Sequence, residues 1–474
     1  MAPRWSFSRF IKPCSALAVI AVVSSCVSYH QSTLTFNQEF ETGDLEGALN
    51  SLRTDRSSNR PAQEFLYQVN NGLVLSMLGR YEESNEYFEQ AYLYGEDYRK
   101  NYLAEVSSYL TNPTFTSYKG EDHEHLMLLY YKALNYMKMN QRDEALVECR
   151  RLNIRLQQLS DRYDSDQKYR EDAFVHLLMG VIYDVDRDYN NAFIAYRNAY
   201  NIYEGSFHDL FGLRPPEQLK FDLLRTARLS GLDDEYEYWK QTVGEEYEPN
   251  ENEEAELIFF WHNGLSPLKV EWGVNFVISK SGNWVTFKNP DLGLTFPFNM
   301  ERYEEKDRRG VADLEVFRIA FPRYVERPVY FQTASIERNG TVTELQKIED
   351  VNRVAFKCLD ERMQEEFAKA LLRAALKKVT EHELRKKDKT LGSVVGVINA
   401  LTEKADTRNW QTLPYEVYYS RVPLSVGQNK VTLNLKSPGR PDASYDFEYE
   451  ARKGQVLFHT FTSLESRYPQ YGYY

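Results

Sequence analysis

The sequence predicts a two-part protein in which an all-α half, built from repeated helical hairpins, precedes an α+β half. Three observations support this fold class. Apolar and small residues recur at helical spacings between about residues 42 and 239. From residue 255 onward the apolar pattern changes to the alternation typical of strands. Between the two patterns, residues 233–256 hold eleven acidic side chains against Lys240 alone, which is typical of a solvated linker or helix end.

The composition is that of a folded, acidic protein. The chain has 474 residues, of which 42% are hydrophobic and 27% are charged, and this excludes disorder over the whole chain. The net charge of −12 leaves no broad basic field, so we do not expect nucleic-acid binding. Aromatic residues make up 14% of the chain, but tyrosine suits cores and binding surfaces equally and selects no function.

Residues 1–25 are predicted to be a cleaved signal peptide rather than part of the fold. Basic residues, among them Arg4 and Arg9, precede an apolar run over residues 14–23 that is too short to span a membrane comfortably. The run ends in the letters VSSC, which resemble a bacterial lipobox in which the thiol of Cys26 accepts the lipid. The alternative is an ordinary secretory signal with an incidental cysteine.

Lipidation of Cys26 would attach the mature chain to a membrane that it does not span. More than one acyl chain is generally needed for stable anchoring, and a bacterial lipoprotein carries both a diacylglycerol and an N-acyl chain. The next two residues include no acidic retention signal, so we expect the periplasmic face of the outer membrane. Cys149 and Cys358 are predicted to be buried free thiols, and a single disulfide between them is the alternative.

Three segments between residues 72 and 199 follow one spacing. In each, a small residue is followed by a large one after three positions, a small one after twelve and a large one after sixteen. This pattern is similar to the tetratricopeptide repeat, in which small residues sit where two helices meet and large ones fill the groove between them. The predicted repeat-packing residues are Gly72, Gly79, Tyr81 and Ala91 in the first unit, Ala145 in the second, and Gly180, Tyr183, Tyr189, Ala192, Tyr196 and Ala199 in the third.

The predicted array is irregular. The inter-helix turns at Gly79, Asn140 and Arg187 are separated by 61 and 47 residues, whereas tandem repeats of this kind run about 34 residues. Weaker units are predicted around Gly43 and Gly231. Helical solenoids expose a concave surface that binds proteins or extended peptides. The alternative is that the array only supports the second half, and the sequence leaves open whether that half fills the groove.

We place the domain boundary in the acidic stretch, so that residues 26–248 form the repeat domain and residues 249–474 the α+β domain. In the second domain, strands are predicted to flank a pair of helices, as one sheet or a sandwich with the helices on one face. The predicted strands are residues 255–261, 269–272, 275–278, 284–287, 314–321, 415–420, 430–435, 444–450 and 456–460. The predicted helices cover about residues 348–387 and 392–404.

Two stretches of the second half carry a more specific resemblance. Residues 256–269 (ELIFFWHNGLSPLK), and residues 405–414 (ADTRNWQTLP) with residues 420–424 (SRVPL), resemble two signatures of a family of uncharacterised bacterial lipoproteins. The resemblance implies a tetratricopeptide-like half joined to a β-containing half over nearly the whole mature chain. It implies no activity, because the function of that family is not established.

The sequence contains no catalytic signature that we can identify, and we expect no enzyme, no cofactor and no metal site. His123 and His125 form the only local histidine pair. Residues two apart on a helix do not share a face, so joint metal ligation would need a loop, and we expect a solvated helix N-terminus instead. Paired carboxylates are so frequent in this acidic chain that acid–base glycan hydrolysis stays an alternative.

Asp406, Arg408 and Trp410 form the most distinctive trio of polar and aromatic residues. On an extended chain their alternate spacing would place them on one side, where Arg408 could clamp an anionic group and Trp410 could stack on a sugar. The alternative is an internal ion pair beside a buried tryptophan. We therefore expect a lipid-anchored scaffold with a protein partner in the cell envelope, and a peptidoglycan- or glycan-binding module is the alternative.

Overall fold

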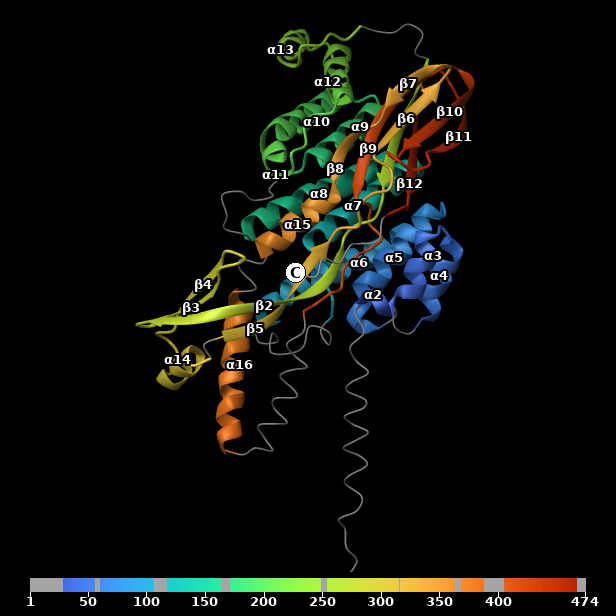
Figure 1. Ribbon diagram of the computed structural model, residues 1–474. Helices are drawn as coiled ribbons and strands as arrows, with labels where there is room; N and C mark the ends of the chain where they lie inside the picture. The colour runs from blue at the N-terminus through green and yellow to red at the C-terminus, as the bar shows by residue number, and fades with distance from the viewer. Residues whose placement is uncertain are drawn as a thin grey trace, which may run out of the picture.

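The computed structural model describes residues 29–55, 60–105, 117–162, 171–248, 254–314, 316–362, 368–387 and 405–466 (Figure 1). Cys26, the predicted signal peptide and the predicted helix over residues 392–404 lie outside these ranges. Within the described part of the chain, no helix combines the length and the apolar character needed to cross a membrane. In the same ranges, helices fill the first half, and strands with three further helices follow from Ala255.

The first half is a series of helical hairpins. The pairs are α3 (Leu34–Glu41) with α4 (Leu45–Thr54), α5 (Glu64–Met77) with α6 (Tyr81–Glu105), α7 (Asp122–Lys138) with α8 (Arg142–Arg162), α9 (Ala173–Val185) with α10 (Tyr189–Ile202), and α12 (Glu217–Leu229) with α13 (Asp233–Val243). Short elements precede or join them, namely α2 (Tyr29–Ser32), η1 (Pro61–Gln63), η4 (Tyr203–Phe207) and α11 (His208–Phe211).

Each of these five hairpins turns through the same backbone motif. A residue with positive φ ends the first helix of each pair, at Gly43, Gly79, Asn140, Arg187 and Gly231. In each turn this residue donates its N–H to the carbonyl three residues earlier, and the next residue donates to the carbonyl five residues earlier. These are the two hydrogen bonds of the Schellman motif, which satisfies the last carbonyls of a helix. The sequence-predicted turns, including the two weak ones, therefore lie at equivalent positions.

The small residues of the predicted repeats lie at close helix contacts. A Cβ atom on Gly72 of α5 would come within 2.7 Å of the Phe88 ring of α6. On Gly180 of α9 it would come within 2.4 Å of the Tyr196 ring of α10. The other small repeat-packing residues, Ala91, Ala145, Ala192 and Ala199, are fully buried, whereas Gly79, Tyr81, Tyr183 and Tyr189 lie at or near the turns and are only partly covered.

The second half contains three four-stranded sheets. The central sheet has the order β12-β1-β9-β8, the outer sheet β11-β10-β6-β7 and the side sheet β4-β3-β2-β5. Among the described strands, every pairing is antiparallel except that of β1 with β12. The strands are β1 (Ala255–Asn263), β2 (Leu268–Ser281), β3 (Trp284–Asn289), β4 (Leu294–Asn299), β5 (Val316–Val325), β6 (Thr333–Arg338), β7 (Thr341–Glu344), β8 (Gln346–Asp350), β9 (Glu416–Leu424), β10 (Gly427–Lys436), β11 (Ala443–Ala451) and β12 (Val456–Ser463).

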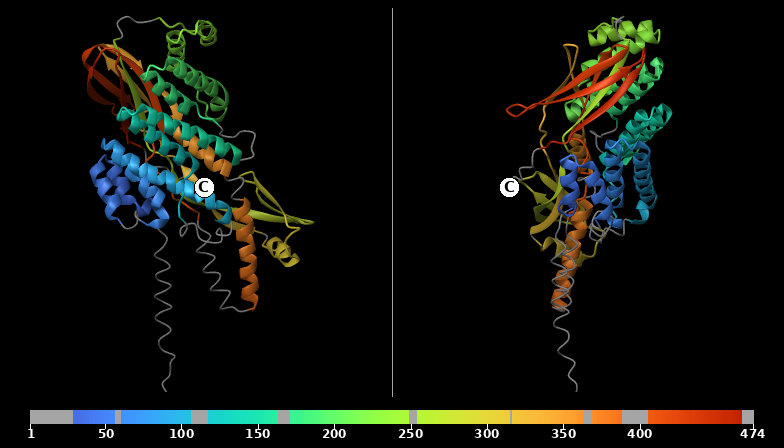
Figure 2. Two further views of the ribbon diagram at one scale, coloured as in Figure 1. Left: turned by 180° about the vertical axis from the view of Figure 1, so that it is seen from behind. Right: turned by 90° about the vertical axis from the view of Figure 1, so that its right-hand side faces the viewer.

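The central sheet is buried on both faces. On β1, Leu257, Phe259 and Trp261 belong to the core shared with the outer sheet. The intervening Ile258 and Phe260 belong to the core of the helical half. Because successive strand residues point to opposite faces, this alternation gives three layers, in the order helices, central sheet and outer sheet. Figure 2 shows the hairpins and the strands on opposite sides of the molecule.

The central sheet covers the inner face of the helical array. The first helices of the hairpins lie toward it, and in α7 fourteen of seventeen residues are buried. One continuous apolar core joins residues of α5, α7, α9 and α12 to residues of β1, β8 and β9. The groove left open by the sequence analysis is therefore filled by the chain's own C-terminal half.

The helices of the second half differ from the expected pair. They are α14 (Glu305–Ala312), α15 (Val351–Arg362) and α16 (Ala368–Lys387). Helix α15 lies against α7, whereas α16 packs with α14 on the side sheet, through residues such as Leu371 and Val379. The predicted helix start at residue 348 is wrong, because Ile348 lies in β8, where its carbonyl accepts a 2.6 Å hydrogen bond from the Tyr203 hydroxyl.

Candidate functional site

The trio of Asp406, Arg408 and Trp410 lies between the two halves of the protein. The Arg408 side chain is buried and donates two hydrogen bonds to Asp406, at 2.6 and 2.8 Å. It donates a third, of 2.7 Å, to the Ala62 carbonyl of η1. Its guanidinium also stands 5.2 Å from the centre of the Tyr118 ring. Each of these contacts is internal, and two of them join the second half to the helical half.

Trp410 is fully buried and has no ring face open for stacking on a ligand. Its ring lies about 6 Å from those of Phe88 and Tyr131, and its indole N–H donates to Thr412 Oγ1 at 2.9 Å. The structure therefore gives the trio the internal arrangement that the sequence analysis held as the alternative. Ligand binding by these three residues stays a prediction.

The N-terminus of α7 is the polar centre of this joint. Glu124 is fully buried and accepts hydrogen bonds from the Trp410 amide at 2.6 Å, the Glu121 amide at 2.9 Å and the Tyr118 hydroxyl at 2.9 Å. Burial, followed by the nearby Glu121 carboxylate, raises the pKa of Glu124 to about 7. Glu121 in turn forms a buried ion pair with Lys269 of β2.

The prediction that the N-terminus of α7 is exposed to solvent is wrong. His123 and His125 are 3% and 6% exposed, because the joint covers this end of the helix. Burial lowers the pKa of His123 to about 4, so this side chain is neutral at physiological pH. Among the residues that the structure describes, no group of three or more histidine, cysteine, aspartate or glutamate side chains is arranged to hold a metal ion.

The two stretches that carry the family resemblance contact one another in the joint. The Asn409 amide donates to the Pro267 carbonyl at 2.8 Å, and the Ser266 hydroxyl donates to the Trp410 carbonyl at 3.0 Å. Further along, β9 pairs with β1 over their whole length. These contacts lie within the second half, where they hold the two stretches against one another.

A second joint is a buried charge network between β9 and the helices. Arg421 lies 2.6 Å from Asp184 of α9 and 3.0 Å from Asp222 of α12. Arg225 of α12 also pairs with Asp184. Burial alone would raise the pKa of Asp184, but the two guanidinium groups outweigh it and lower that pKa. For Asp222, which accepts a 2.7 Å hydrogen bond from Tyr419, burial outweighs the arginines and raises the pKa.

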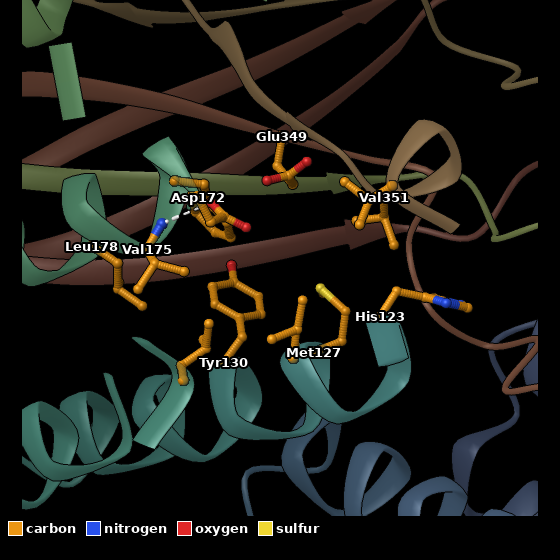
Figure 3. Close-up of a pocket in the computed structure, with 12 residues that line it drawn as sticks. His123, Met127, Tyr130, Asp172, Val175, Leu178, Glu349 and Val351 are labelled. Carbon is orange, nitrogen blue, oxygen red and sulfur yellow. Dashed lines mark hydrogen bonds between the residues drawn. The ribbon is translucent and has the colours of Figure 1, made fainter. Parts of the chain in front are cut away.

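A small cavity between α7, α9 and β8 holds two buried carboxyl groups (Figure 3). Asp172 caps α9 by accepting from the Val175 amide at 3.1 Å, and Glu349 lies across the cavity on β8. Within the described residues, Glu349 Oε2 has no hydrogen-bond partner. Burial, followed by the nearby Asp172 carboxylate, raises the pKa of Glu349 well above its usual value. The cavity volume of about 20 Å³ suits one water molecule and not an organic substrate.

Sequence reasoning missed an open groove between α6 and α8, which we call the outer groove. Its volume is about 520 Å³, and it is lined by residues of α6, of α8 and of the C-terminal end of α7. Its lining residues are Glu82, Asn85, Glu86, Glu89, Tyr136, Met139, Gln141, Glu144, Val147, Glu148 and Arg151. The signal was present, because Glu82, Glu86 and Glu89 on one helix, and Glu144, Glu148 and Arg151 on the other, follow the i, i+4, i+7 spacing of one helix face.

Cys149 and Cys358 are both buried free thiols. Burial raises the pKa of the Cys358 thiol well above its usual value, and it does the same for Cys149. Because the thiolate is the reactive form, neither side chain is suited to nucleophilic chemistry. The two thiols, like Glu124 and Asp184, therefore lie in packed positions of the interior.

These features define the class of fold, an array of tetratricopeptide-like hairpins whose inner face is covered by a mixed β-sheet. Solved structures similar to part of the chain include RapI in its apo form, at 14% identity over 45% of this chain and 68% of that one, with a TM-score of 0.32. BtubC from P. vanneervenii matches at 15% identity over 50% of this chain and 88% of that one, with a TM-score of 0.30.

A tetratricopeptide repeat protein from Parabacteroides merdae matches at 14% identity over 47% of this chain and 81% of its own, with a TM-score of 0.21. No protein-family model matches the chain, and no curated protein matches it. Membership of the uncharacterised lipoprotein family therefore stays a prediction. The assignment of the hairpins rests on the five equivalent turns and the close helix contacts described above.

Proposed function

We propose that this protein is a non-catalytic scaffold of the bacterial cell envelope, anchored by lipid on Cys26 at the periplasmic face of the outer membrane. In this proposal the helical half binds a protein partner through the outer face of its hairpins. The inner face, which repeat arrays commonly use, belongs to the chain's own core. The partner would serve envelope or cell-wall assembly.

The observation that carries the proposal is the distribution of covered and open helical surface. Although the first helices α3 and α12 also expose Leu34, Phe221 and Leu229, the first helices α5, α7 and α9 lie toward the central sheet, whereas their partners α6, α8 and α10 keep large apolar side chains in solvent. These side chains are Leu93, Val147, Ile154 and Ile194, between 38% and 55% exposed. Single exposed apolar residues are ordinary on a protein surface, but here they accompany the outer groove. This combination supports a binding surface on the outer helices.

The position of the predicted anchor supports the idea that the folded part of the protein lies close to the membrane. Cys26 precedes Tyr29, the first described residue, by three positions, and an extended chain covers at most about 3.6 Å per residue. The lipid would therefore attach within about 11 Å of α2. Tyr29 is itself buried, so α2 is packed into the body of the protein.

Site-directed crosslinking in intact cells tests this proposal. A photoreactive amino acid replaces Ile154 or Ile194 on the outer helices, and Val342 on β7, which is 59% exposed, is the matched control. We expect one reproducible partner, identified by mass spectrometry, from the helical positions and not from Val342. The proposal fails if the helical positions capture no partner, or if partners are captured equally from the control position.

A further inference from the structure

We propose that the outer groove binds a short segment of the partner protein that carries lysine or arginine side chains. This inference rests on the proposed scaffold function and adds the chemistry of the segment that is recognised. The groove lies between α6 and α8, and its wall on α6 runs from Glu82 at the rim to Glu89 at the floor. At 1.5 Å per helical residue this wall is about 10 Å long, which suits about three extended residues of a bound chain.

The charges of the groove are divided between its floor and its rim. At the floor, the buried Lys132 pairs with Glu89 and lies 3.0 Å from Glu148. Arg151 lies 3.2 Å from each of the same two carboxylates. Burial alone would raise the pKa of Glu89, but Lys132 and Arg151 outweigh it and lower that pKa. The floor is therefore internally neutralised and holds the two helices together.

The rim carries negative charge that nothing in the described structure neutralises. Glu82, Glu86 and Glu144 are exposed, and within the described ranges none of them forms an ion pair. They stand on the two walls of one groove, so a cation between them would meet carboxylates from both sides. Such a site attracts lysine or arginine and repels anionic lipid and nucleic acid.

A second, independent feature points to a polypeptide ligand. Asn85 lines the groove and is only 7% exposed. Its Oδ1 accepts a 2.8 Å hydrogen bond from Asn135 beneath it, whereas its Nδ2 has no partner within the described residues. A buried amide nitrogen without an acceptor is costly, and a turn of the Asn85 side chain toward the groove would let a backbone carbonyl of a bound segment satisfy it.

The apolar part of the lining suits the stems of long basic side chains. Val147 is 42% exposed on α8, and Tyr136 and Met139 are partly exposed at the end of α7. Lysine and arginine carry three or four methylene groups that pack on apolar surface while their charged ends reach polar groups. The groove therefore offers carboxylates, a free amide donor and an apolar strip to one kind of segment.

The test is binding of a fluorescein-labelled eight-residue peptide of alternating lysine and alanine, measured by fluorescence anisotropy. The purified full-length lipoprotein is used in a non-ionic detergent at low and physiological salt. The groove variant is E82Q/E86Q/E144Q, whose residues make no ion pair in the described structure. The matched control E301Q/E344Q/E450Q removes the same charge from exposed positions of the second half. A third variant, Val147→Lys, places a positive charge on the groove wall.

We expect the groove variant to weaken binding about tenfold, because it removes three carboxylates that can pair with basic side chains of the peptide, and the control to change binding less than twofold. Val147→Lys should weaken binding at least about threefold. The inference is overturned if the wild type does not bind the peptide, or if groove and control variants weaken it equally. If a partner is crosslinked in cells but the groove variant does not change peptide binding, the scaffold function is supported and the outer groove is not its binding site. Binding of the peptide by the groove, together with no crosslinked partner in cells, would support the groove as a site for basic segments and contradict the proposed scaffold function.

Discussion

The guanidinium of Arg421 on β9 lies 2.6 Å from the Asp184 carboxylate on α9, and 237 residues separate the two along the chain. This ion pair is buried and lies where the central sheet meets the helical array. It fixes which strand face meets which helices, because the other charged groups of the network, among them Asp222 and Arg225, meet at the same point.

Removing Arg421 should destabilise the whole protein. In Arg421→Met the Asp184 and Asp222 carboxylates lose a buried counter-charge, and breaking such a pair typically costs about 3–5 kcal/mol. The free energy of unfolding, measured by urea denaturation, should fall by this amount. Arg452→Ala, at an exposed position on the loop before β12, serves as the control and should change it by less than about 0.5 kcal/mol. Equal stability of the two variants would show that the network does not hold the halves together.

The buried carboxyl group of Glu349 should make stability fall as the pH rises. Its pKa is raised in the folded protein, so its contribution is complete below about pH 4.3, where the unfolded side chain is also protonated, and is lost as the pH rises through the folded pKa. In Glu349→Gln the neutral amide needs no proton. The stability of this variant relative to wild type should therefore increase by about 1.4 kcal/mol per pH unit within that interval.

Thermal unfolding of wild type and Glu349→Gln between pH 5 and 8 measures this difference. Other groups with raised pKa values, such as Glu124 and Asp222, titrate in both proteins and cancel in the comparison. The exposed Glu344→Gln is the matched control and should show no dependence on pH relative to wild type. A constant offset between wild type and Glu349→Gln would mean that Glu349 is ionised in the folded state.

Substitutions in the hairpin turns should change the free energy of unfolding only through the backbone conformation at the substituted residue. Gly79 has φ of +78°, and a Cβ atom added there would meet no heavy atom within 4 Å. Gly79→Ala should therefore lower the free energy of unfolding only by the cost of placing alanine in the left-handed region, about 1–2 kcal/mol. Asn140 occupies the equivalent position with φ of +60°, and Asn140→Gly should stabilise by about 0.5 kcal/mol. Chemical denaturation measures both. Effects of the same sign in the two variants would contradict the equivalence of the turns.

Cys26→Ala tests the predicted anchor. Without the thiol no lipid can be attached, so the protein should move from the membrane fraction to the soluble periplasmic fraction and lose incorporation of labelled palmitate. Ser25→Ala keeps a small residue before the cysteine and should leave the protein in the membrane. Continued membrane association of Cys26→Ala in high salt would show that the attachment is not through this residue.

The hairpins could be predicted from sequence because their determinants are local. Gly72 and Gly180 recur at fixed distances from the turns, and small residues at such positions are required where two helices meet. The continuous apolar run of β1 likewise predicted a buried strand, since burial on both faces leaves no polar position between Leu257 and Trp261.

The joints could not be predicted, because their partners come from distant parts of the chain. His123 and Glu124 have the polar sequence of an exposed helix start, and only the contact of Glu124 with the Trp410 amide, 286 residues away, shows why they are buried. The trio containing Arg408 was noticed, but nothing local distinguishes an arginine that binds a ligand from one that binds the Ala62 carbonyl.

The pairing of β1 with β12 has a consequence for the order of events during biosynthesis. The first strand of the second half lies beside β12, the last described strand, so the central sheet cannot be completed until residues Val456–Ser463 have been synthesised. Until then the apolar inner helices lack the part of their cover that β12 supplies. A chain whose synthesis has not reached β12 thus exposes apolar surface that can aggregate, and a chaperone would be needed at that stage and not afterwards.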